Sequence, residues 1–294
     1  MENLLTILDY SSNPSNLRDR IGPIIPLIAQ SPSAVNIQPN SEDGVIVKEI
    51  RDYVFRKCFI EDSEPIKRID AFYHSLLSGL ASYFESARIG STPYIRAPIF
   101  TTNFDNGVEL FASRNGVAIF DGYDRLPAGV YAFNHKLYDT EFNLNSIRLY
   151  KIHGTVRFVR NPRGEFDELT LLPETPEIRI HGEICIPELI YSESYQYTSN
   201  SPQLELLYCM REELAIADRV VVIGYSFPDP HVRTVFREVL GKRHWQGKLV
   251  VCTRNPQSVI DSRFSEIASK CVGVPCDASN LDVSTAFTSN RVPK

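Results

Sequence analysis

The stretch Val220-Val221-Val222-Ile223-Gly224-Tyr225-Ser226-Phe227-Pro228-Asp229-Pro230-His231 decides the fold class of this chain. Its first four residues are apolar on both faces, which is typical of a buried central strand in a parallel sheet. Asp229 follows as a helix N-cap, and Pro230 takes the first helical position. The apolar residues that come next recur on one face of a helix. The stretch therefore predicts a strand, a polar loop and an amphipathic helix in succession.

The same alternation continues on both sides of this stretch. Downstream we expect a strand over 249–252, a helix after Asn255-Pro256 and a last strand over 272–274. Upstream we expect strands over 98–102 and 149–152 and helices over 105–114 and 202–217. Strands that alternate with helices predict an α/β fold, here a Rossmann-like, doubly wound parallel sheet.

The first hundred residues have a different pattern. Apolar residues at helical spacing predict a long helix over 65–88 and a shorter one over 45–59, and a Ser/Pro/Asn-rich stretch over 30–40 predicts a loop. We expect residues 1–96 to be a mainly helical N-terminal part of the same domain, and residues 97–294 to form the Rossmann-like core.

Composition excludes several classes of protein. The chain has 294 residues, 43% of them hydrophobic and 23% charged, as in ordinary soluble domains. Its 31 Lys+Arg against 36 Asp+Glu give a net charge of −5, which argues against nucleic acid as a partner. It shows neither an apolar run of ~18 residues nor a secretory signal, so we expect no membrane association. Six scattered cysteines without a Cys-x-x-Cys pair predict reduced thiols, a cytoplasmic protein and no metal site.

Ligands of such sheets bind beyond the carboxyl ends of the strands, so the residues there are the functional candidates. In Thr101-Thr102-Asn103-Phe104-Asp105, an amide and a carboxylate lie near each other and could hold ribose hydroxyls or orient a water. The alternative is that Asn103 or Asp105 only caps the next helix. His153, next to Gly154, could act as a general base at neutral pH or could be a structural hydrogen-bonding group.

The loop after Ile223 is the third candidate region. Gly224 and Ser226, followed by a helix N-terminus, could cradle phosphate or ribose oxygens. The alternative is an ordinary strand-to-helix turn in which Asp229 caps the helix. Asn255 could bind a ribose hydroxyl or could serve as a turn and cap residue.

Three motifs together resemble a known family. Thr102-Asn103-Phe104-Asp105, Lys151-Ile152-His153-Gly154 and Ile223-Gly224-Tyr225-Ser226-Phe227-Pro228-Asp229-Pro230-His231 occur in the order and rough spacing of sirtuin-like proteins. Over about residues 99–277 the chain most resembles the sirtuin-like NAD hydrolase domains of bacterial antiphage defence systems. The resemblance implies an NAD site with these residues: Asn103 and Asp105 at the nicotinamide ribose, His153 as catalytic base, Thr102, Gly224 and Ser226 as NAD-binding residues, and Asn255 at the adenosine ribose.

Two departures from the family pattern accompany this resemblance. Protein deacetylases of the family carry a four-cysteine zinc module, and without a Cys-x-x-Cys pair we do not expect peptide deacetylation. The family's first strand ends in a Gly-Ala-Gly-x-Ser loop that holds the pyrophosphate. No two of the 15 glycines stand two positions apart, so we expect this loop to be missing, with Met1 just beyond it. Three explanations stay open: a shortened form, another segment that supplies the loop, or loss of NAD binding.

The expected function is that of an NAD glycohydrolase, which cleaves the nicotinamide–ribose bond of NAD to give nicotinamide and ADP-ribose in antiphage defence. The alternative is a catalytically weak or inactive NAD or ADP-ribose sensor, or an interaction domain. Partners beyond NAD or ADP-ribose would be a second copy of the chain or a second defence protein. If the NAD site exists, Asn103, His153, Ser226 and Asn255 should line one cleft at the carboxyl edge of the sheet.

Overall fold

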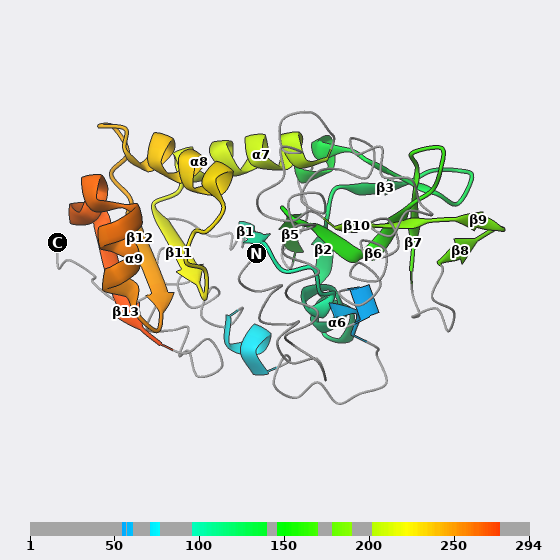
Figure 1. Ribbon diagram of the computed structural model, residues 1–294, viewed down its shortest axis with the longest axis horizontal. Coiled ribbons are helices and arrows are strands. Elements are labelled where there is room, and N and C mark those ends of the chain that lie inside the picture. Colours follow the sequence, from blue (N-terminus) through cyan, green and yellow to red (C-terminus); the bar gives the residue numbers. More distant parts are fainter. Residues whose placement is uncertain are drawn as a thin grey trace, which may run out of the picture.

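A computed structural model describes residues 55–56, 58–60, 71–76, 96–139, 146–169, 178–189 and 202–276 (Figure 1). The helices are α6 (Gly107–Arg114), α7 (Gln203–Ile216), α8 (Pro230–Leu240) and α9 (Pro256–Arg263), with 3₁₀ segments η1 (His135–Asp139) and η3 (Ser265–Lys270). The strands are β1 (Arg96–Thr101), β2 (Ala118–Phe120), β3 (Tyr123–Arg125), β4 (Tyr131–Phe133), β5 (Ser146–Lys151), β6 (Gly154–Arg160), β7 (Phe166–Glu168), β8 (Arg179–Ile180), β9 (Glu183–Ile184), β10 (Ile186–Leu189), β11 (Arg219–Ile223), β12 (Lys248–Thr253) and β13 (Cys271–Pro275).

Parallel strands form two sheets among these residues. One has the order β1-β5-β2 and the other the order β11-β12-β13, each with three strands. All four strand pairs within them are parallel. The fold is therefore mixed α/β with parallel sheets. The sequence predicted one doubly wound sheet, whereas the described ladders make two separate three-stranded sheets.

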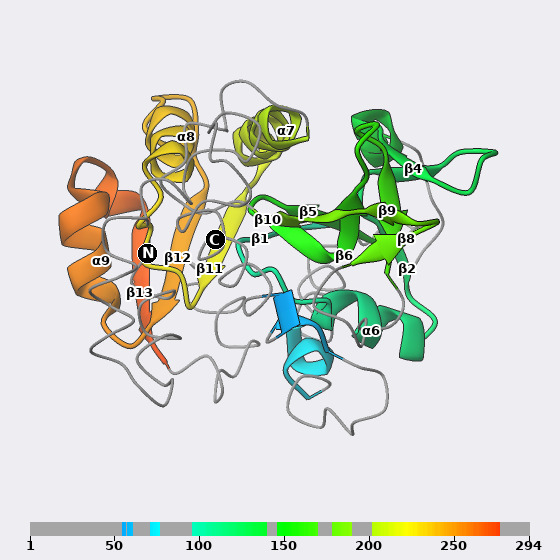
Figure 2. The same ribbon diagram turned by 45° about the vertical axis from the view of Figure 1, so that its right-hand side comes forward.

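An antiparallel sheet was not predicted from the sequence. Its five strands have the order β10-β6-β7-β4-β3, and β8 and β9 form a further two-stranded ladder. Apart from β6 and β10, these strands have only two or three residues, and a window that small carries no clear period-two pattern. In Figure 2 this sheet lies beside β1 and β5, on the side away from α8 and α9.

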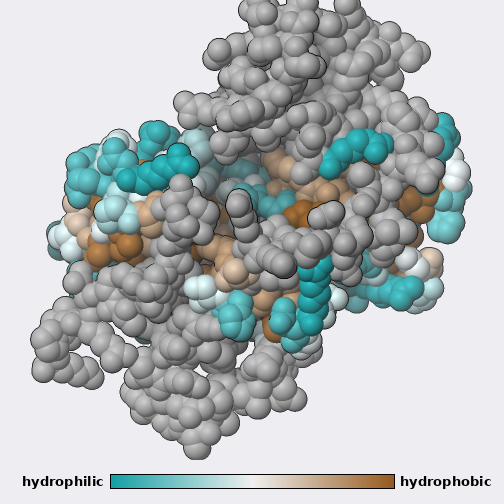
Figure 3. Space-filling model, turned by 90° about the horizontal axis from the view of Figure 1, so that it is seen from below, coloured by the Kyte–Doolittle hydropathy of each residue, from teal (hydrophilic) through white to brown (hydrophobic). Residues whose placement is uncertain are grey.

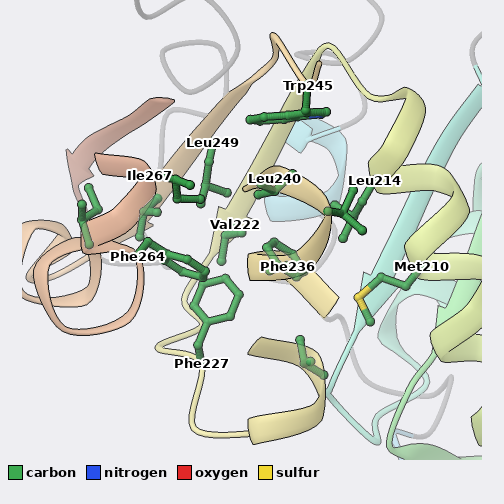
Figure 4. Close-up of a cluster of buried hydrophobic side chains, with 14 of the residues drawn as sticks. Met210, Leu214, Val222, Phe227, Phe236, Leu240, Trp245, Leu249, Phe264 and Ile267 are labelled. Carbon is green, nitrogen blue, oxygen red and sulfur yellow. The ribbon is translucent and has the colours of Figure 1, made fainter. Parts of the chain in front are cut away.

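Strand β12 is the centre of the second parallel sheet. Leu249 and Val251 pack into a cluster with residues of α7, α8 and α9, which Figure 4 shows in close-up. Val250 and Cys252 point to the opposite face and pack with the helical residues 71–76. Helical segments thus cover both faces of this strand, which is the layer arrangement of a doubly wound fold.

The position of β11 corrects one prediction. The sequence places residues 220–223 in a central, buried strand, but β11 pairs only with β12 among the described residues and is mostly half-buried. The four consecutive apolar residues of β11 resemble those of a central strand because both faces of β11 contact hydrophobic clusters. Burial on two faces does not require a hydrogen-bonded neighbour on two edges, and the apolar run reports only the former.

The remaining elements of the C-terminal half agree with the prediction. The helices expected over 202–217 and 230–240 and after Asn255-Pro256 are α7, α8 and α9, and the last expected strand is β13. Asp229 is the N-cap of α8 and Pro230 follows it. Of the N-terminal region, residues 55–56, 58 and 71–76 are helical, inside the predicted helices. The rest of those helices and the loop over 30–40 lie outside the described residues.

The face in Figure 3 carries hydrophilic and hydrophobic residues side by side in the described part. No described helix is both long enough and apolar enough to cross a membrane.

Cys185 and Cys252 are buried, whereas the other four cysteines are half-buried, and all six are free thiols.

Candidate functional site

The carboxyl ends of β1 and β5 lie at the same edge of their sheet. The two strands are parallel, and Thr101 is the register partner of Lys151 at the last rung. The backbone N–H of Ile152 donates to the carbonyl of Thr101 at 3.0 Å, which extends the pairing by one residue. Thr102, Asn103 and Asp105 leave this edge from β1, and His153 leaves it from β5. The structure therefore brings the first two predicted motifs together.

A second edge carries the other predicted residues. Ile223 of β11 is the register partner of Cys252 of β12, so Gly224, Ser226 and Asn255 follow neighbouring strand ends. Gly224 has φ +68°, a left-handed conformation that glycine adopts without steric cost. Its N–H donates to the carbonyl of Cys252 at 2.9 Å. Ser226 and Asn255 are exposed, and the side chain of Asn255 makes no capping bond at α9.

One buried contact joins the two edges. Nε2 of His153 lies 2.9 Å from Oδ2 of Asp229, across 76 residues of sequence. The exposed fractions of the two side chains are 7% and 0%. Because His153 follows β5 and Asp229 follows β11, this contact fixes the two parallel sheets relative to each other at their carboxyl ends. The contact also sets the predicted base beside the loop that contains Ser226.

The loop before α8 holds Asp229 in place. Phe227 has φ +58°, a conformation that costs a residue with a Cβ about 1 to 2 kcal/mol. Its side chain is fully buried and packs edge-on against Phe264, with 4.6 Å between ring centroids, and against Phe236 at 4.9 Å. The Arg233 guanidinium donates to the carbonyl of Phe227 at 3.2 Å. Packing and a hydrogen bond together offset the unfavourable backbone conformation.

Asp229 also caps α8. Its Oδ1 accepts from the N–H groups of His231 at 2.8 Å and of Val232 at 3.2 Å. The sequence predicted this cap, and the structure adds that the other carboxylate oxygen contacts His153. Burial, with the charge of Asp229 as a second cause, raises the pKa of the nearby Tyr225 hydroxyl, which therefore stays protonated.

The two predicted residues of the first motif differ in their surroundings. Asn103 is exposed, and its backbone N–H donates to Oγ1 of Thr101 at 3.0 Å. Asp105 is half-buried, and its Oδ1 accepts from the N–H of Gly107 at 2.9 Å at the start of α6. The carboxylate of Asp105 thus bonds to the first residue of α6, although the N-cap of that helix is Asn106 rather than Asn103 or Asp105. Thr102, which precedes both, is half-buried.

Sequence reasoning assigned no role to Lys151, Glu109 and Thr253. Lys151 is buried, its ammonium group donates to the carbonyl of Asp105, and its Nζ lies 3.4 Å from Oε1 of Glu109. Burial raises the pKa of Glu109, against the opposing effect of the Lys151 charge. Oγ1 of Thr253, at the end of β12, is buried without a hydrogen-bond partner. Thr253 could have been noticed in the sequence because it is a polar residue at the end of an apolar strand.

No group of three or more His, Cys, Asp or Glu residues with metal-binding geometry occurs in the part of the chain that the structure describes. The predicted set is brought together only in part. His153 meets the loop of Ser226 through Asp229, and Asn103 shares an edge with His153, whereas Asn255 makes no described contact with any of them.

Residues 97–271 match the SIR2-like domain family. The chain belongs to this family. The match confirms the sirtuin-like resemblance and places the chain in a family of NAD-dependent enzymes. A comparison with curated proteins found no match.

Solved structures also resemble this SIR2-like chain. One is reported as "Structural Basis for the Mechanism and Regulation of Sir2 Enzymes", with 13% sequence identity, a TM-score of 0.42, and coverage of 89% of this chain and 79% of that one. Another is reported as "The Structural basis for Sirtuin Substrate affinity", with 15% identity, a TM-score of 0.41, and coverage of 98% and 95%.

Proposed function

We propose that this SIR2-like chain is an NAD glycohydrolase, which cleaves the bond between nicotinamide and ribose in NAD. In this reaction the C1′–N bond breaks, its electron pair goes to the pyridinium ring, and neutral nicotinamide leaves. Water forms the new C1′–O bond and loses a proton, so the products are nicotinamide, ADP-ribose and a proton. The transition state resembles an oxocarbenium ion, as in glycoside hydrolysis.

The observation that carries this proposal is the position of His153 at the carboxyl edge of β5, held by Asp229 from the neighbouring sheet. The leaving group needs no general acid, so the chemistry requires a base and a positioned water. We assign the base to His153, a role typically worth about 10²- to 10⁴-fold in rate. Asn103, exposed at the same edge, would orient the water.

The loop of Ser226 would bind a ribose rather than the pyrophosphate. The carboxylate of Asp229 already accepts from two N–H groups at the N-terminus of α8. A phosphate at that helix end would meet this buried negative charge, whereas a neutral ribose hydroxyl would not. Gly224 lets a ligand approach the backbone closely, and the exposed Ser226 hydroxyl can donate or accept. We therefore assign Thr102, Gly224, Ser226 and Asn255 to the sugar portion of NAD.

We assign Asp105 a supporting role in this reaction. Its carboxylate is bonded to the start of α6, yet it lies two residues after Asn103 at the same edge. From there its negative charge favours the positive charge that develops on the ribose in the transition state. On the resemblance to antiphage proteins, we place the activity in defence against phage in the cytoplasm.

Incubation of the purified chain with NAD, followed by chromatographic measurement of nicotinamide and ADP-ribose, tests the proposal. Equal amounts of the two products, absent when His153 is replaced by Ala, are expected. A thermal shift with NAD but no nicotinamide release would overturn the hydrolase and favour the sensor. Neither a thermal shift nor product would favour an interaction domain.

A further inference from the structure

We propose that Asp229 is the positioning residue that fixes the tautomer of His153, so that His153 takes up a proton through Nδ1. This inference rests on the proposed function for its kinetic consequences, but its structural content does not depend on catalysis. It follows from how the two oxygens of one fully buried carboxylate are used.

The carboxyl group of Asp229 is ionised. Its side chain is 0% exposed, and its Oδ1 accepts from the backbone N–H groups of His231 and Val232. These donors belong to the N-terminus of α8, where the helix dipole favours a negative charge. Charge-assisted bonds of this kind stabilise the ionised form. Asp229 is therefore a carboxylate, which accepts hydrogen bonds and has none to donate.

The charge of Asp229 decides which nitrogen of His153 carries the hydrogen. Its Nε2 lies 2.9 Å from Oδ2 of Asp229, a distance at which one of the two atoms must donate. Since the carboxylate cannot donate, Nε2 carries the hydrogen. In a neutral imidazole the other nitrogen then holds the lone pair. The ring nitrogen that accepts a proton is thus Nδ1, as in arrangements where a buried carboxylate orients a catalytic imidazole.

Both Asp229 and His153 are held in place by the surrounding structure. Asp229 is held by the α8 cap on one side and by the Phe227 turn on the other, where Phe227 is buried against Phe236 and Phe264. His153 follows the buried end of β5. Neither partner can turn away without loss of a cap or of core packing. The structure therefore uses one residue both to begin a helix and to orient the imidazole.

The variant Asp229→Asn tests this without loss of the cap, because Asn is as good an N-cap as Asp. The amide oxygen must remain at the N–H groups of α8, so the NH₂ group takes the place of Oδ2 and faces Nε2. An NH₂ group donates, so the His153 proton is expected to move to Nδ1. The same change at the exposed Asp218, at the start of β11, is the matched control.

The readout is ¹H–¹⁵N NMR of histidine-labelled protein, with the His153 signals assigned by their absence in His153→Gln. We expect the Nε2–H tautomer in the unmodified chain and in Asp218→Asn, and the Nδ1–H tautomer in Asp229→Asn. An Nδ1–H tautomer in the unmodified chain, or the same tautomer in both Asp229 forms, would overturn the proposal. This result holds whether or not the chain cleaves NAD.

The kinetic readout applies if nicotinamide is released. Where a buried carboxylate orients a catalytic imidazole, an amide in its place lowers kcat about 10⁴-fold, because the imidazole takes the wrong tautomer. We expect Asp229→Asn to lower kcat by this factor with KM within about twofold, since the ligand-binding loops remain in place. A rise in KM alone, with kcat unchanged, would instead assign Asp229 to substrate binding. Asp218→Asn should keep both constants.

Discussion

The side chain of Asn106 holds both backbone groups of Ile60. Its Oδ1 accepts from the N–H of Ile60 at 2.8 Å, and its Nδ2 donates to the carbonyl of Ile60 at 3.0 Å. Asn106 is 8% exposed and directly precedes α6, the helix that follows the carboxyl end of β1. Ile60 is therefore joined to the start of α6 by a pair of hydrogen bonds.

Replacement of Asn106 by Ala should destabilise the protein by about 2 to 3 kcal/mol. The change removes two hydrogen bonds worth about 1 kcal/mol each and leaves the backbone groups of Ile60 without these partners. Urea denaturation followed by circular dichroism measures the effect. Asn115→Ala is the matched control, because its exposed side chain bonds only within α6, and it should change stability by less than about 0.5 kcal/mol. Equal effects of the two variants would show that the Asn106–Ile60 contact contributes nothing special.

The catalytic assignment makes an ordered prediction for three variants. If the chain cleaves NAD, His153→Ala should lower the rate at least about 100-fold, because a general base is lost while little core is removed. Asn103→Ala should have a similar effect through the loss of water orientation. His231→Ala should matter less, since His231 lies in the first turn of α8. Nicotinamide release measures all three, and near-normal turnover by the His153 variant would exclude the mechanism.

The C-terminal half of the fold could be predicted because its signals are local. Asp229 and Pro230 mark the start of α8, and the apolar run of β12 is bounded by a glycine before it and an Asn-Pro turn after it. Apart from β5, which the sequence predicts over 149–152, the strands between α6 and α7 could not be found in the same way. Their pairing depends on contacts such as the Arg157 guanidinium with the carboxylates of Asp121 and Glu168, at 2.7 and 2.6 Å. Such pairs are set by topology rather than by neighbours in sequence.

The candidate site shows the same division. His153 could be predicted to follow a strand, and Asp229 could be predicted as a cap, each from adjacent residues. Their contact spans 76 positions and depends on how β5 and β11 are placed in space. The burial of Lys151 could not be predicted either. Its partner Glu109 lies on α6, and nothing in the sequence near Lys151 indicates that contact.

Because Phe227 has a left-handed backbone conformation, we expect its glycine variant to be more stable than its alanine variant. Phe227→Ala should destabilise by about 3 to 5 kcal/mol through loss of a buried ring. Phe227→Gly loses the same ring but adopts φ +58° without a Cβ clash. The glycine variant should therefore be about 1 kcal/mol more stable than the alanine variant, although glycine is usually the more destabilising. Chemical denaturation of the two variants measures this difference, and a less stable glycine variant would contradict a left-handed Phe227.

The cysteines predict slow thiol chemistry in the native protein. Burial raises the pKa of Cys252 to about 12, with Cys276 as a further cause, and burial raises the pKa of Cys58, Cys209 and Cys271 to about 11. Thiolate is the reactive form, so at pH 8 iodoacetamide should modify Cys58, Cys209 and Cys271 about 100-fold more slowly than in the unfolded chain, and Cys252 about 1000-fold more slowly. Mass spectrometry of peptides after timed alkylation measures each site. Rapid modification of Cys252 would contradict its buried position in β12.

The last prediction concerns the pyrophosphate of NAD. No two of the 15 glycines stand two positions apart, and the α8 N-terminus is occupied by Asp229. A glycine-rich loop would donate two or three charge-assisted hydrogen bonds to the pyrophosphate, at about 1.5 to 3 kcal/mol each. A chain without them should bind NAD at least about 100-fold more weakly than a chain that has such a loop. Isothermal titration of the purified chain with NAD measures this affinity.

Addition of a strand should restore that affinity. Among the described residues, β1 pairs only with β5 and β11 only with β12. An N-terminal fusion of a Val- and Ile-rich strand that ends in Gly-x-Gly-x-Ser should tighten NAD binding and raise nicotinamide release. The same fusion with Ala-x-Ala-x-Ser should do neither, because a Cβ blocks close approach of the pyrophosphate to the backbone. Tight binding of NAD by the monomeric chain without any fusion would show that the glycine spacing is no guide to pyrophosphate binding here.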